Sequence, residues 1–478
     1  MEINDRNTRE RIILSSLREI MNDNSIEVTD DFFSVGGDSK KAVEFLNVLR
    51  EQNLNITLRD FFGCRTVQEL AKIVSGQKID YHKTIDRMID NIRPREKKSV
   101  CLPMDEVKVT GKKTYSSIFF TGATGYLGSH IAVQLLESTK STLFFLVRGK
   151  KENICKERVR SVWKEYFQDD IFDIYEKRIR IIPGDVSQKK FGLKATEYNS
   201  LAENVDCIIH TAAVVSHVET WEKYEKVNIQ GTENILKFSV YIRKKDVNYI
   251  STIATEITKK RLKSMEMFTE KCLEEDQSDI WYVQSKIECE KLLENYRKKG
   301  CLIKIYRMGF LVQNYHTGRF QINAKENGLF NVLAILNNMK TFPNVRQNII
   351  DLTYVDEAAK AVVELFTLED NLKIYHIFNP RRISIGYMGE ALKKINPEIN
   401  ILELEEYRKF LYENCDKYIN QIEKMALILM LDNNIDLNIF GLSCNEKTMK
   451  ILESQGFSWH DFDEKAANDI YKIIKNEV

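Results

Sequence analysis

A glycine-rich turn between an apolar run and a helical stretch constrains the fold more than any other feature. The run covers residues 118–120, and the sequence TGATGYLG follows at 121–128, with Gly122, Gly125 and Gly128 spaced three apart. Glycines at this spacing let the backbone approach a pyrophosphate where a helix begins, whereas an ordinary strand-to-helix turn needs no such set. The pattern predicts a dinucleotide site with seven contacts: Thr121, Gly122, Thr124, Gly125, Tyr126, Leu127 and Gly128.

Further strand-like runs alternate with helical stretches after this turn. They cover residues 142–147, 180–182, 205–210, 247–251 and 303–307. This alternation is typical of a doubly wound parallel sheet, so we expect an α/β fold of the Rossmann type. The length of 478 residues leaves room for about three folded units, since a domain averages roughly 150 residues.

The composition divides the chain into four regions. Residues 1–77 predict a bundle of short helices, and residues 78–115 are polar and basic, as in a linker. Residues 116–310 carry the strand and helix alternation, and residues 311–478 predict a smaller, mainly helical substrate subdomain whose elements can return to the sheet. Within it, residues 327–333 fit either a substrate-facing helix or ordinary core, and residues 395–478 contain no recognisable motif.

Charge and cysteine content exclude several classes of protein. The net charge is +1, so no overall field attracts nucleic acid or an anionic membrane. The nine cysteines lack the close pairing of zinc and redox sites, which predicts free thiols and no metal. Neither a secretory signal nor an apolar run of membrane-spanning length is present, so we expect a soluble cytoplasmic protein.

The ends of the predicted strands supply further cofactor contacts. The second strand ends at Arg148, where an NAD site would place an acid on the ribose, and this cation favours NADPH. A solvated charge is the alternative for Arg148, and Arg158 is a weaker candidate for the same phosphate. The ends of the next two strands add four predicted contacts: Asp185, Val186, Ala212 and Ala213.

A tyrosine and a lysine four residues apart predict the catalytic pair. Tyr282 and Lys286 share one face of a helix, where the lysine charge can favour the phenolate, although a surface pair is the commoner origin of this spacing. Thr252 ends a strand-like run and can supply a third hydroxyl. Ser251 is the alternative, because strand alternation points only one of the two into the cleft.

In this order, these motifs resemble the extended short-chain dehydrogenase/reductase superfamily. The series GATGYLG, LVRG, GDV, FGL, HTAAVV, NIQGT, STIAT, YVQSK and YRMG more narrowly resembles the terminal thioester reductase domain of nonribosomal peptide synthetases and carboxylic acid reductases. The resemblance covers residues 116 to at least 380 and implies that Thr252, Tyr282 and Lys286 are catalytic, with Lys286 also on the cofactor. Met308 and Tyr354 stand where the family usually has proline, which puts loop shape in question.

A second resemblance covers the N-terminal region. The segment DDFFSVGGDSKKAVEFLNVLREQNLNITLRDFF, followed by TVQELA, resembles a peptidyl carrier domain along its whole length. In that family the serine of this motif carries 4′-phosphopantetheine, which implies Ser39 as the attachment point. A capping serine is the alternative for the residue alone, although a phosphodiester also suits a helix N-terminus.

Together the two resemblances imply reductive release of a carrier-bound acyl or peptidyl thioester by NADPH. The product is an aldehyde, and a second hydride would give an alcohol. The implied partners are upstream synthetase modules and a phosphopantetheinyl transferase. The alternatives are an epimerase or dehydratase acting on a free nucleotide sugar, a non-catalytic NADPH-binding module, and a fatty acyl reductase acting on membrane lipids.

Overall fold

The protein is described from a computed structural model. The structure describes residues 6–476 with the following ranges excepted: 33–34, 36, 38, 55, 57–60, 62–63, 65, 75–80, 94–106, 168–169, 216–218, 265–266, 274–276, 279, 348, 419, 423–424 and 426–440.

The N-terminal region has a small apolar core of its own. Its described helices are α1 (Arg6–Met21), α2 (Ser39–Glu51) and α4 (Val67–Val74). Phe32, Phe45 and Phe61 are fully buried between them, and the Phe32 and Phe61 rings meet edge to face with centroids 4.8 Å apart. Glu69 N–H donates to Thr66 Oγ1, so Thr66 caps the start of α4. Part of the predicted four-helix bundle falls on residues 55–65, most of which lie outside the described set.

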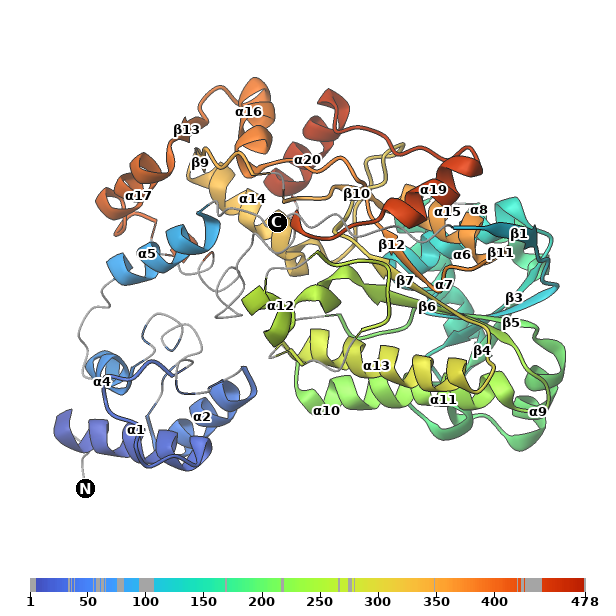
Figure 1. The fold of residues 1–478 in the computed structure, drawn as a ribbon, viewed down its shortest axis with the longest axis horizontal. Helices are drawn as coiled ribbons and strands as arrows, with labels where there is room; N and C mark the ends of the chain where they lie inside the picture. Colours follow the sequence, from blue (N-terminus) through green and yellow to red (C-terminus); the bar gives the residue numbers. More distant parts are fainter. Residues whose placement is uncertain are drawn as a thin grey trace.

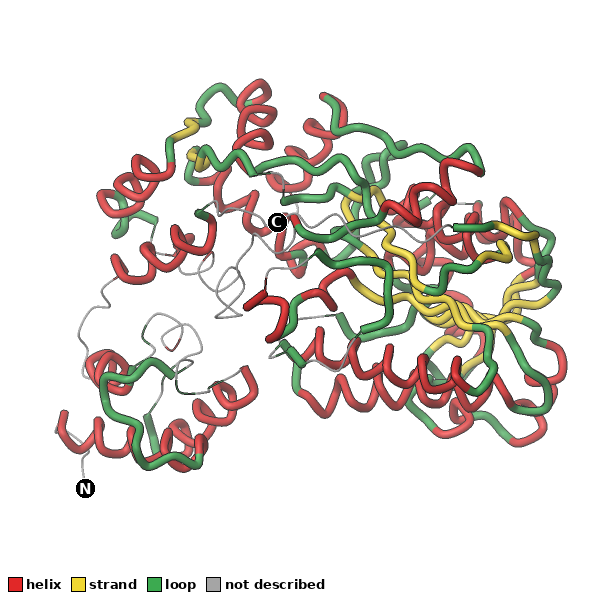
Figure 2. Tube along the Cα trace, viewed as in Figure 1, coloured by secondary structure: helices red, strands yellow, loops and turns green. Residues whose placement is uncertain are grey.

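A seven-stranded parallel sheet forms the centre of the remaining chain (Figure 2). Its strands, in spatial order, are β12 (Ile374–Ile377), β7 (Ile303–Met308), β6 (Asp246–Thr252), β5 (Cys207–His210), β2 (Ser117–Thr121), β3 (Thr142–Val147) and β4 (Ile179–Pro183). Strand β2 begins the sheet in sequence and pairs with β3 on one side and β5 on the other. This is the doubly wound order predicted from the sequence, with its switch point between β2 and β5.

Helices cover both faces of the sheet (Figure 1). On one face are α6 (Tyr126–Ser138), α7 (Glu152–Tyr166), α8 (Ile171–Tyr175), α15 (Val355–Phe366) and α19 (Glu446–Ser454). On the other are α9 (Ala195–Asn204), α10 (Trp221–Tyr224), α11 (Gln230–Val240) and α13 (Trp281–Lys298). Central strands such as β2 and β5 are buried on both faces, which is why they appear in the sequence as largely continuous apolar runs, whereas the edge strand β4 is only partly buried.

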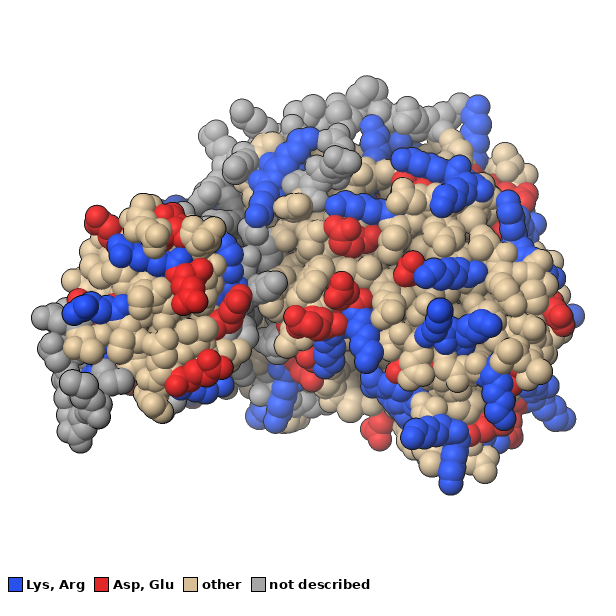
Figure 3. Space-filling model, turned by 90° about the horizontal axis from the view of Figure 1, so that it is seen from below, with Lys and Arg blue, Asp and Glu red and all other residues tan. Residues whose placement is uncertain are grey.

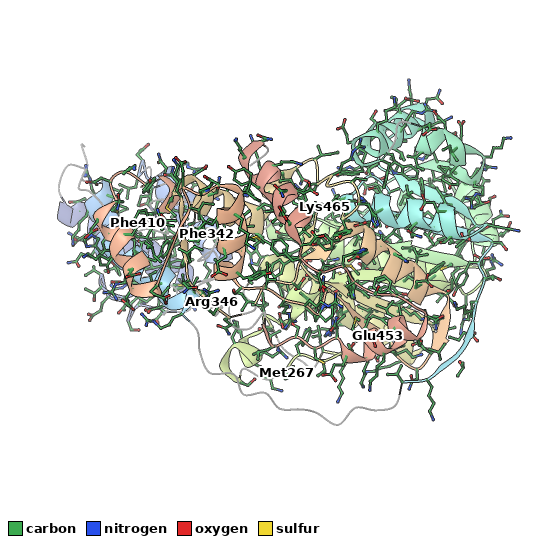
Figure 4. All side chains as sticks on the ribbon, turned by 90° about the horizontal axis from the view of Figure 1, so that it is seen from above. Met267, Phe342, Arg346, Phe410, Glu453 and Lys465 are labelled. Atoms are coloured by element: carbon green, nitrogen blue, oxygen red, sulfur yellow. The ribbon has the colours of Figure 1, made fainter. Side chains whose placement is uncertain are left out.

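The C-terminal region divides between a separate subdomain and the sheet. The subdomain contains α14 (Gly328–Asn338), α16 (Ile385–Ile395), α17 (Leu404–Glu413), α20 (Glu464–Asn476), β9 (Thr341–Pro343) and β13 (Asn400–Leu402). Figure 4 shows Phe342 of β9 and Phe410 of α17 at one end of the molecule, well apart from Glu453 of α19. Residues 330–336 of α14 are buried, so this helix supplies core rather than a substrate-facing surface. Strand β12 and helices α15 and α19 return to the sheet.

Two ordered elements lie inside the range 78–115 predicted as a linker. Helix α5 (Tyr81–Ile92) buries Ile85, Met88, Ile89 and Ile92 in the core of the C-terminal subdomain. Strand β1 (Val109–Lys112) pairs antiparallel with β11 (Leu368–Asp370). The helix was not expected because most of its residues are polar, and its apolar stripe at i, i+3, i+4 and i+7 is the only local signal.

Polar contacts fix α5 to α17. The rings of His82 and Tyr412 stack with centroids 4.3 Å apart, and the Tyr412 hydroxyl donates to Asp86. Arg93 Nη2 lies 2.8 Å from Glu405 Oε1. Since α4 ends at Val74 and α5 begins at Tyr81, only residues 75–80 separate the N-terminal core from an element fixed to the subdomain. Figure 1 shows α5 beside α17.

The surface carries both charges. Figure 3 shows acidic side chains lying among Lys and Arg side chains on the face seen from below. No helix among the described residues is long and apolar enough to cross a membrane. Within the same described part of the chain, no group of three or more His, Cys, Asp or Glu residues could hold a metal ion.

Candidate functional site

The glycine turn joins β2 to α6 at the switch point of the sheet, where open parallel sheets bind ligands. Gly122 has a positive φ of 85°, and a Cβ there would lie 2.1 Å from Thr211 Oγ1. A Cβ on Gly128 would lie 2.1 Å from the Gly122 carbonyl oxygen. Both positions therefore accept only glycine without displacement of backbone or neighbouring side chains.

The start of α6 is open to a ligand. Gly125 is its exposed N-cap, and no side chain caps the first turn. A Cβ on Gly125 would meet only the Gly122 oxygen within 4 Å, at 3.3 Å. The unpaired N–H groups of a helix start favour an anion, so the turn fits a pyrophosphate. Thr124 and Tyr126 flank this opening and are partly exposed, whereas Leu127 and Gly128 are buried.

Hydrogen bonds tie the turn to the end of β5. Thr211 Oγ1 donates to the Thr121 carbonyl over 2.8 Å, and Ala212 N–H donates to Thr121 Oγ1 over 3.3 Å. His210 Nδ1 lies 2.7 Å from the same Thr121 hydroxyl. Thr121 thus organises the turn from beneath, since its side chain is buried rather than open to a ligand, while Ala212 and Ala213 are partly exposed.

The remaining predicted cofactor contacts lie on neighbouring strand ends. Arg148 is exposed immediately after β3, and Arg158 Nη1 donates to the Arg148 carbonyl over 3.3 Å, so the Arg158 side chain lies beside the backbone of Arg148. Asp185 follows β4, and its Oδ1 accepts from the N–H and hydroxyl of Ser187. Val186 is buried, and its carbonyl accepts from Asn234 Nδ2.

The structure distinguishes between Ser251 and Thr252 at the end of β6. Ser251 is buried and donates to Glu290 Oε1 over 2.6 Å, within an ion pair that Glu290 forms with Arg307. Thr252 is partly exposed, and its side chain is hydrogen-bonded to Tyr282. Of these two hydroxyl groups, that of Thr252 is the one next to Tyr282.

Helix α13 brings Tyr282 and Lys286 to the end of β6. Lys286 Nζ donates to the Ile250 carbonyl over 2.9 Å and to the Tyr249 hydroxyl over 3.2 Å. Burial lowers the pKa of Lys286 to about 8 and raises the pKa of Tyr282 to about 12. The hydrogen bond to Thr252 opposes the effect of burial on the pKa of Tyr282 but does not cancel it. The phenol of Tyr282 is therefore neutral at pH 7.

Asn228 is a residue of the site that the sequence reasoning missed. It lies in a π-helical turn, η3 (Glu225–Ile229), between α10 and α11. Its side chain exchanges hydrogen bonds with the backbone of Val214 and donates to Ser285 Oγ over 2.9 Å. It thereby joins the loop after β5 to the helix that carries Tyr282. The motif NIQGT contains this residue, but only the fold brings its partners together.

The two departures from the family pattern are both buried side chains. Met308 ends β7 opposite Thr252 of β6 and is buried. Tyr354 of β10 (Thr353–Tyr354) is fully buried in the subdomain core and packs against Tyr315 with ring centroids 5.0 Å apart. Asp351 lies between these two positions in the sequence, and its Oδ1 accepts from Phe310 N–H over 2.7 Å. A Cβ on Gly309 would lie 2.3 Å from the same oxygen.

Ser39 is the first residue of α2, so the predicted attachment point stands at a helix start. Its side chain and the neighbouring Gly36 and Asp38 lie outside the described set. Gly37 is described, and a Cβ there would lie 2.3 Å from the Phe32 ring. Gly37 therefore packs tightly against Phe32 of the aromatic core of the N-terminal region.

Known protein families match two parts of the chain. Residues 11–74 match the family described as "Phosphopantetheine attachment site", and residues 120–362 match the family described as "Male sterility protein". The chain is 26% identical over 400 residues to a linear gramicidin synthase subunit of Brevibacillus parabrevis, covering 82% of this chain and 8% of that protein. It is 26% identical over 446 residues to the L-2-aminoadipate reductase large subunit of Candida glabrata, covering 85% and 31%. It thus spans less than a third of these relatives.

Solved structures share the fold. A thiolation-reductase di-domain from an archaeal non-ribosomal peptide synthetase matches with a TM-score of 0.68 and 24% identity, covering 98% of this chain and 97% of that one. The terminal R domain of the myxalamid pathway matches with a TM-score of 0.64 and 24% identity, covering 77% and 93%. These matches confirm the predicted fold class and the resemblance to a carrier and reductase pair. Since its family match covers half of its residues, the chain belongs to the NAD-binding male sterility protein family and carries a phosphopantetheine attachment domain ahead of that match.

Proposed function

We propose that this chain is the carrier and reductase portion of a nonribosomal peptide synthetase, which releases a carrier-bound acyl or peptidyl thioester by NADPH-dependent reduction. One observation carries the proposal: Tyr282, hydrogen-bonded to Thr252 and one turn from buried Lys286, shares a chain with a phosphopantetheine attachment domain. A proton donor explains a reduction, and the attachment domain explains how the substrate arrives.

The cofactor site is the glycine turn with its flanking strand ends. The open start of α6 at Gly125 would bind the pyrophosphate, and Arg148 with Arg158 would bind the 2′-phosphate of NADPH. Asp185 and Val186 would hold the adenine, and Ala212 and Ala213 would leave room for the ribose. Lys286 would hold the nicotinamide ribose. NADPH, when bound, supplies the hydride.

Side chains of the protein bind and protonate the oxygen of the substrate carbonyl. Thr252 and Tyr282 donate hydrogen bonds to the oxyanion that develops when hydride adds to the thioester carbon, and Tyr282 transfers its proton to that oxygen. The Lys286 charge stabilises the resulting tyrosinate. The carbon–sulfur bond then breaks, the pantetheine thiol leaves with a proton, and an aldehyde is released. A second hydride and proton would convert the aldehyde to an alcohol.

The attachment domain defines the partners. Ser39 receives 4′-phosphopantetheine from a phosphopantetheinyl transferase, and upstream synthetase modules load the arm. Two similar proteins are named as a gramicidin synthase subunit and an aminoadipate reductase subunit. The first name supports peptide synthesis and the second supports reduction, as the proposal requires. An enzyme acting on a free nucleotide sugar has no use for residues 11–74.

The experiment follows the released product. The chain is treated with a phosphopantetheinyl transferase and simple acyl-coenzyme A thioesters, NADPH is added, and released small molecules are identified by mass spectrometry. We expect the aldehyde or alcohol of the loaded acyl group. A Ser39→Ala variant should gain no mass from the transferase but should still reduce free acyl-pantetheine. Mass gain in that variant, or NADPH consumption without a reduced acyl product, would contradict the proposal.

A further inference from the structure

A buried polar chain begins at Lys286 and leads away from the substrate side. The ammonium donates to the Tyr249 hydroxyl over 3.2 Å and lies 4.8 Å from the centroid of the Tyr249 ring. Lys286 is 3% exposed and Tyr249 is 2% exposed. An ammonium removed from water needs such acceptors, because an unpaired buried charge is costly.

The chain continues across two strands. The side chains of Thr232 and Cys289 lie close enough to the Tyr249 hydroxyl to shift its pKa, and Thr232 Oγ1 donates to Cys289 Sγ over 3.4 Å. Thr232 Oγ1 lies 3.4 Å from His210 Nε2 and is 1% exposed. The contacts join β6, α11, α13 and β5 at one point beneath the cleft.

The chain ends at the cofactor turn. His210 Nδ1 lies 2.7 Å from Thr121 Oγ1, which in turn accepts from Ala212 N–H. Thr121 Oγ1 already accepts from Ala212 N–H, so its own hydroxyl proton is free to donate to His210 Nδ1. The neutral imidazole then carries its proton on Nε2, which faces Thr232, and every one of these groups has a partner. Burial lowers the pKa of His210 to about 3, so the imidazole stays neutral.

We propose that Tyr249 and His210 are positioning residues at the two ends of this chain, Tyr249 for Lys286 and His210 for Thr121 and the glycine turn. The proposal rests on the proposed function, since Lys286 must lie against the cofactor that the turn binds. Each inner member of the chain has its polar atoms satisfied by other buried groups, so a shift at one end leaves a group unpaired. The chain therefore holds the lysine and the turn at a fixed separation.

Titratable groups approach Lys286 from three of the described elements. Tyr249 and His210 face it from β6 and β5, and Tyr282, Cys289 and Glu290 lie on its own helix. Glu290 is paired with Arg307 and Ser251, and burial raises the pKa of the Cys289 thiol. At neutral pH the Tyr249 hydroxyl is therefore the neutral side-chain acceptor on which the ammonium depends, alongside the Ile250 carbonyl.

The test measures NADPH binding by fluorescence titration across pH 6 to 10, which requires no thioester. Tyr249→Phe should move the alkaline loss of affinity to lower pH by roughly one unit, because the ammonium loses an acceptor and its pKa falls. Tyr306→Phe is the matched control: Tyr306 is a fully buried tyrosine on β7 whose hydroxyl donates to Asn248 Oδ1 over 2.8 Å, outside the chain. Its pH profile should match that of the wild type.

The role of His210 is tested through its partner Thr121, because a variant of a buried histidine can fail to fold. Thr121→Val should weaken NADPH binding roughly tenfold at every pH, whereas Thr121→Ser, which keeps the hydroxyl, should restore it. Wild-type protein that binds no NADPH would overturn the proposed function and the positioning roles with it. Wild-type protein that binds NADPH, with Tyr249→Phe and Tyr306→Phe sharing one pH profile, would overturn the positioning role of Tyr249 alone.

Discussion

The N-terminal carrier region and the cofactor cleft are built in opposite ways. The described core of the carrier region is apolar, centred on Phe32, Phe45 and Phe61. The cleft instead rests on buried polar groups that satisfy one another, from Thr121 and His210 to Lys286. A cleft that binds charged groups must orient dipoles and protons, whereas a carrier needs only to present one serine. The predictions below separate these two regions.

Tyr282→Phe should affect the cleft alone and have the largest effect. Loss of the proton donor should lower kcat by about 10²–10⁴-fold for carrier-bound and free acyl-pantetheine alike. NADPH affinity should stay within about twofold, since the phenol contributes to proton transfer rather than cofactor binding. Initial rates of NADPH oxidation measure the first effect and fluorescence titration the second. Retained activity would remove Tyr282 from the proposed mechanism.

Phe45→Ala should affect the carrier alone. Truncation of a fully buried phenylalanine costs about 3–5 kcal/mol, which is comparable to the total stability of a small domain. Hydrogen exchange should then show loss of protection in α1, α2 and α4, and reduction of free acyl-pantetheine should be unchanged. Glu44→Ala, an exposed change on the same helix, is the control. Loss of free-substrate activity in Phe45→Ala would mean that the two regions are not independent.

Arg148→Ala should weaken one contact within the cleft. A charge-assisted hydrogen bond to phosphate contributes about 1.5–3 kcal/mol, so preference for NADPH over NADH should fall by roughly 10- to 100-fold. Arg158→Ala should have a smaller effect. Arg180→Ala, an exposed change near the opposite end of β4, is the control. The measurement is the ratio of kcat/KM for NADPH to kcat/KM for NADH. An unchanged ratio in Arg148→Ala would mean that other residues bind the 2′-phosphate.

Ile89→Asp should affect only the connection between the regions. Releasing α5 moves the first attachment of the chain to the rest of the molecule from α5 to β1, which begins at Val109, and effective concentration falls with about the −3/2 power of the length of a flexible connection. Turnover of carrier-bound substrate should therefore fall roughly tenfold, while turnover of free acyl-pantetheine should not change. Asp90→Asn is the matched control on the exposed side of α5. Equal turnover by Ile89→Asp and Asp90→Asn would show that anchoring of α5 has no effect on delivery.

The sequence signals for the cofactor turn and for the tyrosine and lysine pair were local. The glycines of residues 122–128 and the spacing of Tyr282 and Lys286 are short-range patterns imposed by backbone geometry and helix periodicity. Such patterns are legible in the sequence alone, because each depends only on residues that are neighbours along the chain.

The remaining features depend on contacts between distant segments. The choice between Ser251 and Thr252 required Glu290 and Arg307, which lie on a helix and a strand further along the chain. Tyr249 carries no local signal because its partners lie on elements separated by intervening helices and strands. Helix α5 was missed because its stripe of four apolar residues becomes meaningful only beside the core that buries it.

The short connection between α4 and α5 limits how far the carrier can travel. From Val74 to Tyr81 a chain spans at most roughly 25 Å even when fully extended. While α5 stays docked, the end of α4 stays within that distance of Tyr81, so the carrier region pivots about the subdomain rather than about the sheet. Any other enzyme that acts on the same serine must therefore reach a carrier held at this pivot, so the position of α5 restricts the layout of any larger assembly as well as the delivery of substrate.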